Sequence, residues 1–267
     1  MQRLEAGGVT LAMWTVAIVG FVYLLIPLVM IFPLSLETGS MLRFPPKNIG
    51  FHWFVAYLTD GSWMGATMVS LRVALFATIV ATTVGVLASV GMHRQDIPGK
   101  NLFNIILVLP MMLPLVVVAI SVYGVYASLG LVGTEFGIAM AHAVLCLPFV
   151  ILNVNSALAA LPRSYEEASL SLGASPITSL WLVTIPLIWR GIAAGAIFAF
   201  VISFDEVVIA MFLSSIDTTT LPKKMLDGIF FDLSPILAAI SAVLIIFNIA
   251  LALLGLALAN KTRKRNA

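Results

Sequence analysis

The chain has 267 residues, of which 61% are hydrophobic and only 10% are charged, and its formal net charge is +2. Soluble domains carry about 25% charged residues, so the composition excludes an ordinary soluble protein. The small net charge gives no electrostatic basis for binding nucleic acid, and we expect no such partner. The mean hydropathy of +1.11 instead predicts an integral membrane protein in contact with the lipid bilayer.

Six apolar stretches are candidate membrane spans, because a helix needs about 20 apolar residues to cross the hydrocarbon. They predict an all-α integral membrane fold that forms a single transmembrane domain over residues 1–267. Only the fifth span contains acidic residues. In chain order the spans cover residues 9–36, 66–92, 101–129, 136–161, 187–214 and 233–260.

The Lys and Arg residues predict the orientation, because cytoplasmic loops carry an excess of them. With both termini inside, the inner segments hold nine of the 14 basic residues and the outer segments hold five. The tail KTRKR contributes most to this excess. We therefore expect a multi-pass membrane protein with both termini inside, N-in and C-in.

Two local patterns bear on the shape of the bundle. The first outer segment contains FPPKNIGFHWFVAYL, whose aromatic residues are typical of a helix lying at the membrane interface. Prolines also lie within or at the edges of spans three, four and five, where neighbouring helices can satisfy the carbonyls that they free. We interpret these prolines as kinks in a packed bundle; they are Pro110, Pro114, Pro148 and Pro186.

Residues 162–186, between spans four and five, form a polar insertion that contains SYEEASLSLGASP. Ser164 and Glu167 have the spacing of a capping box at a helix start. Gly173 stands where a left-handed residue ends a helix, and Ser175-Pro176 is typical of a new helix start. The pattern predicts two short cytoplasmic helices joined by a glycine elbow. These helices either fit a groove on another protein or form a surface hairpin that the acids merely stabilise.

The spacing within this insertion resembles a known signature. Glu167-Ala168-Ser169, three residues, Gly173, nine residues and Val183-Thr184-Ile185-Pro186 are similar to the EAA motif of permease subunits of ABC importers, E-A-A-x3-G-x9-I-x-L-P. Three residues differ mildly from the pattern. The resemblance extends over essentially the whole chain. It implies the type I importer (MetI-like) permease fold and a location in a bacterial cell inner (plasma) membrane.

The same resemblance implies how the chain works with partners. The insertion would be the coupling helix that docks on an ATP-binding subunit, through Glu166, Glu167, Ala168, Ser169 and Gly173. The implied assembly contains two ATPase subunits, a second and non-identical permease, and an extracytoplasmic solute-binding protein. ATP and Mg would be bound by the ATPase subunits, and we expect no cofactor on this chain.

The sequence itself is consistent with ATP binding by other subunits, since it contains no phosphate-binding G-x-x-x-x-G-K-[ST] motif. The nearest fragment, Pro98-Gly99-Lys100-Asn101, lacks the first glycine and the hydroxyl. No arrangement of residues is placed for catalysis, so we expect a transport subunit and not an enzyme. His142 and Cys146 have no companions at metal-ligand spacing, and we interpret His142 as a hydrogen-bonded residue of the bundle.

Span five contains the stretch FVISFDEVVIAMFLSS, with two acids in an apolar run. A charge at the membrane centre costs about 2.5–3.5 kcal/mol, so such residues usually face a cavity or a partner. We expect the solute pathway at Asp205, with Glu206 second and Phe204 beside them. The alternative is that both acids pair with polar groups of other spans, or lie in an unwound, hydrated break.

Two carboxylates would attract a cation, and SFDEVVI followed by TLPKK resembles the spermidine/putrescine branch of these permeases. That resemblance implies uptake of a polyamine, with this chain forming half of the pathway. Related branches carry amino acids, opines or ferric iron. Two other classes stay open, namely a secondary carrier driven by an ion gradient and a membrane scaffold that transports nothing.

Overall fold

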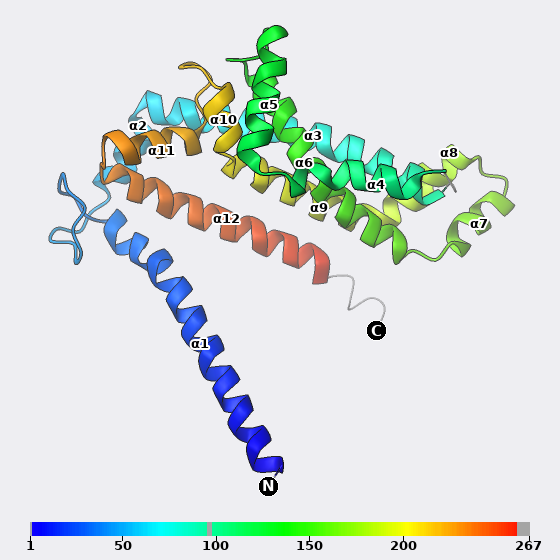
Figure 1. Cartoon of the computed structure of the whole chain (residues 1–267), viewed down its shortest axis with the longest axis horizontal. Coiled ribbons are helices and arrows are strands. Elements are labelled where there is room, and N and C mark those ends of the chain that lie inside the picture. Colours follow the sequence, from blue (N-terminus) through cyan, green and yellow to red (C-terminus); the bar gives the residue numbers. More distant parts are fainter. Residues whose placement is uncertain (1, 95–97, 261–267) are drawn as a thin grey trace. The chain divides into compact units, whose positions relative to one another are not determined.

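The structure is a computed structural model that describes residues 2–94 and 98–260, and most of those residues are helical (Figure 1). The basic tail KTRKR lies outside the described residues. The helices, including the 3-10 turn η1 and the π turn η2, are α1 (Gln2–Ser35), α2 (His52–Thr59), α3 (Gly61–Arg94), α4 (Lys100–Val108), η1 (Leu109–Met112), α5 (Leu115–Ser128), α6 (Glu135–Ala159), α7 (Ser164–Ser171), α8 (Pro176–Ser179), η2 (Leu180–Thr184), α9 (Ile185–Asp205), α10 (Val208–Leu213), α11 (Leu221–Phe231) and α12 (Ile236–Asn260).

The predicted spans are found as apolar helices. Within the described residues, five helices are long and apolar enough to cross a membrane, and the count is six if one bent pair forms a single span. The bent pair, Leu102–Met112 with Leu115–Ser128, occupies the predicted third span. The five straight candidates are Met13–Ser35, Gly61–His93, Glu135–Ala159, Pro176–Asp205 and Ile236–Gly255.

The prolines of the third span produce more than the expected kink, because its two halves meet at 103°. Pro114 lacks an N–H group and forces the preceding residue, Leu113, into an extended conformation with ψ at 145°. A new helix then begins directly after Pro114. The span is therefore broken at this point.

The chain divides into two compact units, Met1–Gly61 with Asp227–Phe247 and Ser62–Leu226 with Asn248–Ala267. In the first unit, no side chain in the apolar window of α1 is buried, as expected for a helix that faces lipid or a partner. The predicted interfacial helix is present as α2. Its place at the membrane surface stays a prediction, as does the single domain over residues 1–267.

A buried carboxylate organises the outer segment of the first unit. Glu37 is only 2% exposed, and its two oxygens accept hydrogen bonds from the backbone N–H groups of Gly39 (3.0 Å) and Lys47 (2.8 Å). The Lys47 bond, followed by the Gly39 bond, holds the pKa of Glu37 below its ordinary value. The sequence does not reveal this role, because the two donors come from opposite ends of the loop.

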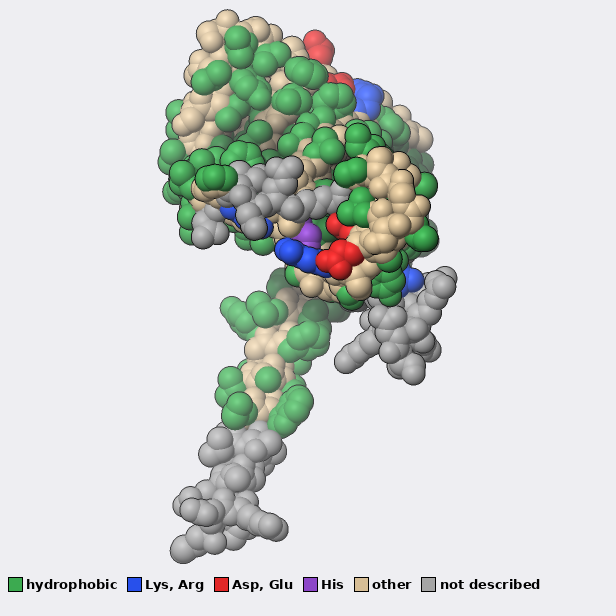
Figure 2. Space-filling view, turned by 90° about the vertical axis from the view of Figure 1, so that its right-hand side faces the viewer, with side chains coloured by type: hydrophobic (Ala, Val, Ile, Leu, Met, Phe, Trp, Pro, Cys, Tyr) green, Lys and Arg blue, Asp and Glu red, His purple; other side chains and the backbone are tan. Residues whose placement is uncertain are grey.

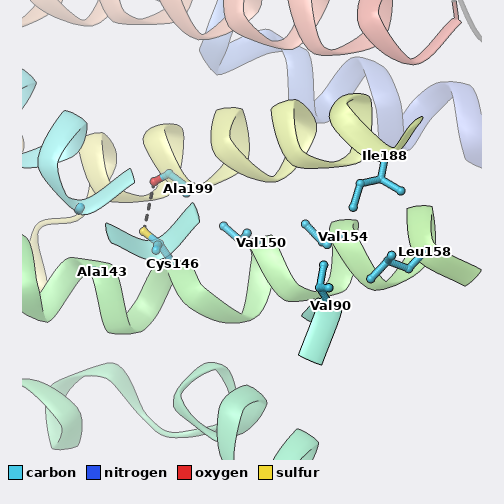
Figure 3. Packing of buried hydrophobic residues seen from close by; sticks show 10 residues of the cluster. Val90, Ala143, Cys146, Val150, Val154, Leu158, Ile188 and Ala199 are labelled. Carbon is cyan, nitrogen blue, oxygen red and sulfur yellow. Dashed lines mark hydrogen bonds between the residues drawn. The ribbon is translucent and has the colours of Figure 1, made fainter. Parts of the chain in front are cut away.

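The second unit packs around α6. Buried apolar side chains of α3, α6 and α9 form one cluster, shown in Figure 3 with Val150 and Val154 of α6 facing α9. A second cluster joins α6 to α3, α5 and α10. Because α6 contributes to both clusters, it fixes the position of α9 and α10, the helices that carry the acids of span five.

Small residues allow α9 to approach α6 closely. A Cβ added at Gly195 would lie 3.1 Å from the Cα of Val150, and one added at Gly191 would lie 2.5 Å from the Cβ of Ala157. Close backbone approach through small residues is a common way to pack helices in lipid, where burial of apolar surface gives little driving force.

Candidate functional site

The polar insertion begins with α7, but its start differs from the prediction. Arg163 is the N-cap, and no side chain caps the helix. The carbonyl of Arg163 accepts the N–H of Glu167 (3.1 Å), so Ser164 already lies inside the first turn. The predicted capping box between Ser164 and Glu167 is therefore wrong. The preceding Pro162 explains the shift, because its fixed φ favours an earlier helical turn and its carbonyl accepts the N–H of Tyr165.

The glycine elbow is confirmed. Gly173 has φ +89°, a left-handed conformation that glycine adopts without strain. The N–H of Ala174 bonds the carbonyl of Ser169 (3.1 Å), which closes the helix end in the expected way. Ser175 then accepts the N–H of Thr178 (3.1 Å) and caps the next helix, with Pro176 in its first turn.

The second predicted short helix is not separate. Residues Pro176–Asp205 form one 30-residue helical stretch that leads from the insertion into the fifth span. The π turn η2 lies within this stretch and ends at Thr184, two residues before Pro186. A proline cannot donate to the carbonyl four residues earlier, and a local widening of the helix accommodates its ring.

The predicted coupling residues point in different directions. Glu167, Ala168 and Gly173 are exposed, whereas Glu166 and Ser169 are half-buried. A hollow of about 150 Å³ beside α7 is lined in part by His93, Arg163 and both glutamates. Figure 2 shows acidic, basic and histidine side chains gathered at one place on this face.

The two half-buried residues bind to the helix that follows the elbow. The Thr184 hydroxyl donates to Oε1 of Glu166 over 2.6 Å, and the Ser169 hydroxyl donates to that of Ser179 over 2.6 Å. Both partners in the following helix, Thr184 and Ser179, are buried. Glu166 and Glu167 are therefore adjacent in sequence but different in environment.

Span five is broken between its two acids. Helix α9 ends at Asp205 and α10 begins at Val208. The carboxylate of Glu206 lies at the start of α10 and accepts the backbone N–H groups of Val208 (2.7 Å), Ile209 (2.9 Å) and Ala210 (3.3 Å). These donors would bond the carbonyls four residues earlier in a continuous helix, so Glu206 replaces those carbonyls and maintains the break.

A histidine from another helix completes the surroundings of Glu206. Nε2 of His142, on α6, lies 3.2 Å from Oε2 of Glu206, and Nδ1 lies 3.0 Å from the hydroxyl of Ser203. His142 and Glu206 are 1% and 7% exposed. The pairing expected under the structural alternative is therefore present for Glu206, and His142 is the bundle residue that the sequence predicts.

Asp205 has the opposite environment. Its side chain is exposed in this chain, and Oδ2 accepts a hydrogen bond from Nδ2 of Asn248 on α12 over 3.1 Å. Phe204 is 3% exposed and stacks on Phe200, with 5.8 Å between the ring centroids. Of the three predicted pathway residues, only Asp205 reaches the surface. No sequence pattern pointed to Asn248 as its partner.

The break makes the end of α9 rich in hydrogen-bond acceptors. Because Glu206 takes the N–H groups of Val208 and Ile209, the carbonyls of Phe204 and Asp205 lose their helical donors. The C-terminal end of a helix also carries partial negative charge. Together with the exposed carboxylate of Asp205, this end suits a cationic group.

Comparison with known proteins identifies the kind of chain that carries these features. Residues 81–264 match the model of the family described as binding-protein-dependent transport system inner membrane component. The chain belongs to this family. It is therefore an inner-membrane permease of an ABC importer, and the resemblance carried by the EAA-like spacing is confirmed.

Individual relatives agree with this assignment. The permease is 29% identical to the spermidine/putrescine transport system permease protein PotC of Escherichia coli K12, over 92% of this chain and 93% of PotC. It is 28% identical to the putrescine transport system permease protein PotI of the same organism, over 87% and 85%.

A solved structure shows the same fold. One chain of a bacterial ABC transporter for import of the acidic polysaccharide alginate superposes with a TM-score of 0.68 at 18% identity, over 94% of this permease and 95% of that chain. At this identity the likeness establishes the type I importer permease fold alone. It confirms the predicted fold class.

Proposed function

We propose that this permease forms half of an ATP-driven import pathway for a small organic cation of the polyamine type. A second permease subunit completes the pathway, a pair of ATPase subunits drives it, and an extracytoplasmic binding protein delivers the solute. The observation that carries the proposal is the break in span five, which leaves Asp205 exposed at an acceptor-rich helix end beside Asn248.

The chemistry of this site favours a cation. An ammonium group has three donors and one positive charge, which matches a carboxylate, an amide oxygen and the backbone carbonyls at the end of α9. Broken membrane helices commonly use such half-helix ends to hold cations. The names of the relatives PotC and PotI, which mention spermidine and putrescine, favour a polyamine over the amino acids, opines or ferric iron of related branches.

The insertion at 162–186 supports the assignment of the ATPase contact. Glu167 and Ala168 are exposed on α7, next to the polar hollow lined by His93 and Arg163. A short exposed helix beside a depression suits the helix-in-groove mode of recognition. The ATPase subunits then dock on the exposed side of α7, and nucleotide-driven closure moves both permease halves.

Purified permease tests the energy source when it is reconstituted in liposomes with and without its ATPase subunits. We expect uptake of labelled spermidine or putrescine only with the ATPase subunits, ATP and the loaded binding protein. An ion-gradient carrier is the competing function, because an exposed acid at a broken helix also suits a proton or sodium site. Uptake driven by a proton or sodium gradient without any ATPase subunit would overturn the proposal and favour the ion-gradient carrier.

Substitution of Asp205 by asparagine tests the solute site. We expect the apparent affinity for the cation or the rate of uptake to fall about tenfold or more, equivalent to ~1.4 kcal/mol, because the variant removes the exposed negative charge. Asp205→Glu keeps the charge and should retain more uptake than Asp205→Asn. Asp217→Asn, which alters an exposed acid outside the break, is the matched control. Unchanged uptake by Asp205→Asn would remove Asp205 from the pathway.

A further inference from the structure

The two adjacent glutamates of α7 lie on different faces of the same helix, about 100° apart. Glu166 is half-buried and accepts a 2.6 Å hydrogen bond from Thr184, which is fully buried. Glu167 is exposed. A motif that places two acids side by side therefore contains one residue directed into the permease and one available to a partner.

The helix that Glu166 contacts is the one that ends at the proposed solute site. Pro176–Asp205 is a single 30-residue helical stretch, about 45 Å long at 1.5 Å per residue. Thr184 lies in its π turn, and Asp205 is the last residue of α9. A displacement applied near Thr184 is thus carried along a continuous helix to Asp205.

The covalent connection between α7 and this long helix is poorly suited to transmit such a displacement. It consists of the elbow at Gly173, and glycine has a more permissive backbone than other residue types because it has no side chain. Among the side-chain hydrogen bonds that bridge the elbow are one from Thr184 to Glu166 and one from Ser169 to Ser179. Such bonds oppose rotation of α7 about Gly173 relative to the long helix.

We propose that Glu166 is a positioning residue that joins α7 to the Thr184 turn, so that movement of the docked helix reaches the solute site. Glu166 acts within the permease, and Glu167 acts toward the ATPase subunit. The hydrogen bond between Ser169 and Ser179 forms a second connection across the elbow. The inference rests on the proposed function, because it assigns how the docking helix and the pathway are connected.

The test uses the complete importer, reconstituted with its ATPase subunits, second permease and loaded binding protein. Two variants remove the joint, Thr184→Val by loss of the donor at constant shape and Glu166→Ala by loss of the acceptor. Two matched variants keep it, Thr184→Ser with its hydroxyl and Glu166→Gln with its carbonyl oxygen. The measured quantities are copurification of the ATPase subunits, ATP hydrolysed, and labelled spermidine transported per ATP.

We expect the joint-removing variants to retain the ATPase subunits and to hydrolyse ATP, but to transport about fivefold less solute per ATP. The double variant with Thr184→Val and Glu166→Ala should transport as much solute per ATP as either single variant, because both changes break the same contact. Thr184→Ser and Glu166→Gln should couple normally. Normal coupling in Thr184→Val, or a defect in Glu166→Gln as large as in Glu166→Ala, would overturn the proposal.

A parallel variant separates this inference from the proposed function. Glu167→Ala should weaken copurification of the ATPase subunits while leaving the Glu166–Thr184 contact intact. If Glu167→Ala leaves association and transport unchanged, the docking assignment fails. If Glu166→Ala also releases the ATPase subunits, Glu166 is a docking residue, and the joint is overturned while the docking assignment stands.

Discussion

Replacing Glu206 with alanine is expected to destabilise the folded permease by about 3–5 kcal/mol, the typical cost of breaking a buried pair of ionisable groups by removing one partner. The variant leaves Nε2 of His142 without its carboxylate neighbour at a fully buried position. It also removes the acceptor of three backbone N–H groups at the start of α10. Those groups regain partners only if the break closes into a continuous helix, which would take the carbonyls away from the solute site.

Thermal unfolding of the detergent-purified chain measures this effect. Glu206→Gln should be milder than Glu206→Ala, because its carbonyl oxygen can still accept one or two of the N–H groups. Glu167→Ala, at the exposed side of α7, is the control and should unfold at the wild-type temperature. A wild-type unfolding temperature for Glu206→Ala would show that the carboxylate does not maintain the break.

Leucine at Gly195 should separate α9 from α6 and cost about 3 kcal/mol or more, because the new side chain meets backbone that cannot rotate away. The nearest atoms to an added Cβ are the Cα of Val150 at 3.1 Å and its carbonyl oxygen at 3.4 Å. The hydrogen bond between His142 of α6 and Ser203 of α9 also joins these two helices. We therefore expect loss of folded protein and, in any remaining protein, loss of uptake.

Gly65→Leu is the matched control for this substitution. Gly65 is also helical, and outside its own helical turn no atom lies within 4 Å of a Cβ added there. The amount of monodisperse protein after size-exclusion chromatography and its unfolding temperature distinguish the two variants. Equal values for Gly195→Leu and Gly65→Leu would contradict the close packing of α6 and α9.

The break in span five explains why two neighbouring acids can occur in an apolar helix. The carboxylate of Glu206 is buried and contacts His142 and the backbone N–H groups at the start of α10, whereas Asp205 is exposed beside Asn248. The structural alternative considered for both acids thus applies to Glu206. Each acid has its own polar surroundings, so the cost of placing charge in the membrane is offset at both positions.

The sequence alone determined the class, the spans and the elbow. Apolar length and the glycine at 173 act through local physics, namely transfer into lipid and the conformational freedom of one residue. The EAA-like spacing indicated the family for the same reason, since it lies within 20 consecutive residues. The failed capping box shows the limit of such rules, because Pro162 moved the helix start by one residue.

The tertiary structure decided which acid is buried and which coupling residue faces inward. His142 and Glu206 are 64 residues apart in sequence, Asn248 and Asp205 are 43 apart, and Thr184 and Glu166 are 18 apart. No local pattern encodes contacts of this kind, because they depend on how α6 and α12 approach the break in span five and on how α7 folds back against η2. Adjacent residues on a helix differ in direction by about 100°. Tertiary packing therefore determines which residue of each acidic pair, Glu166 and Glu167 or Asp205 and Glu206, faces the protein interior.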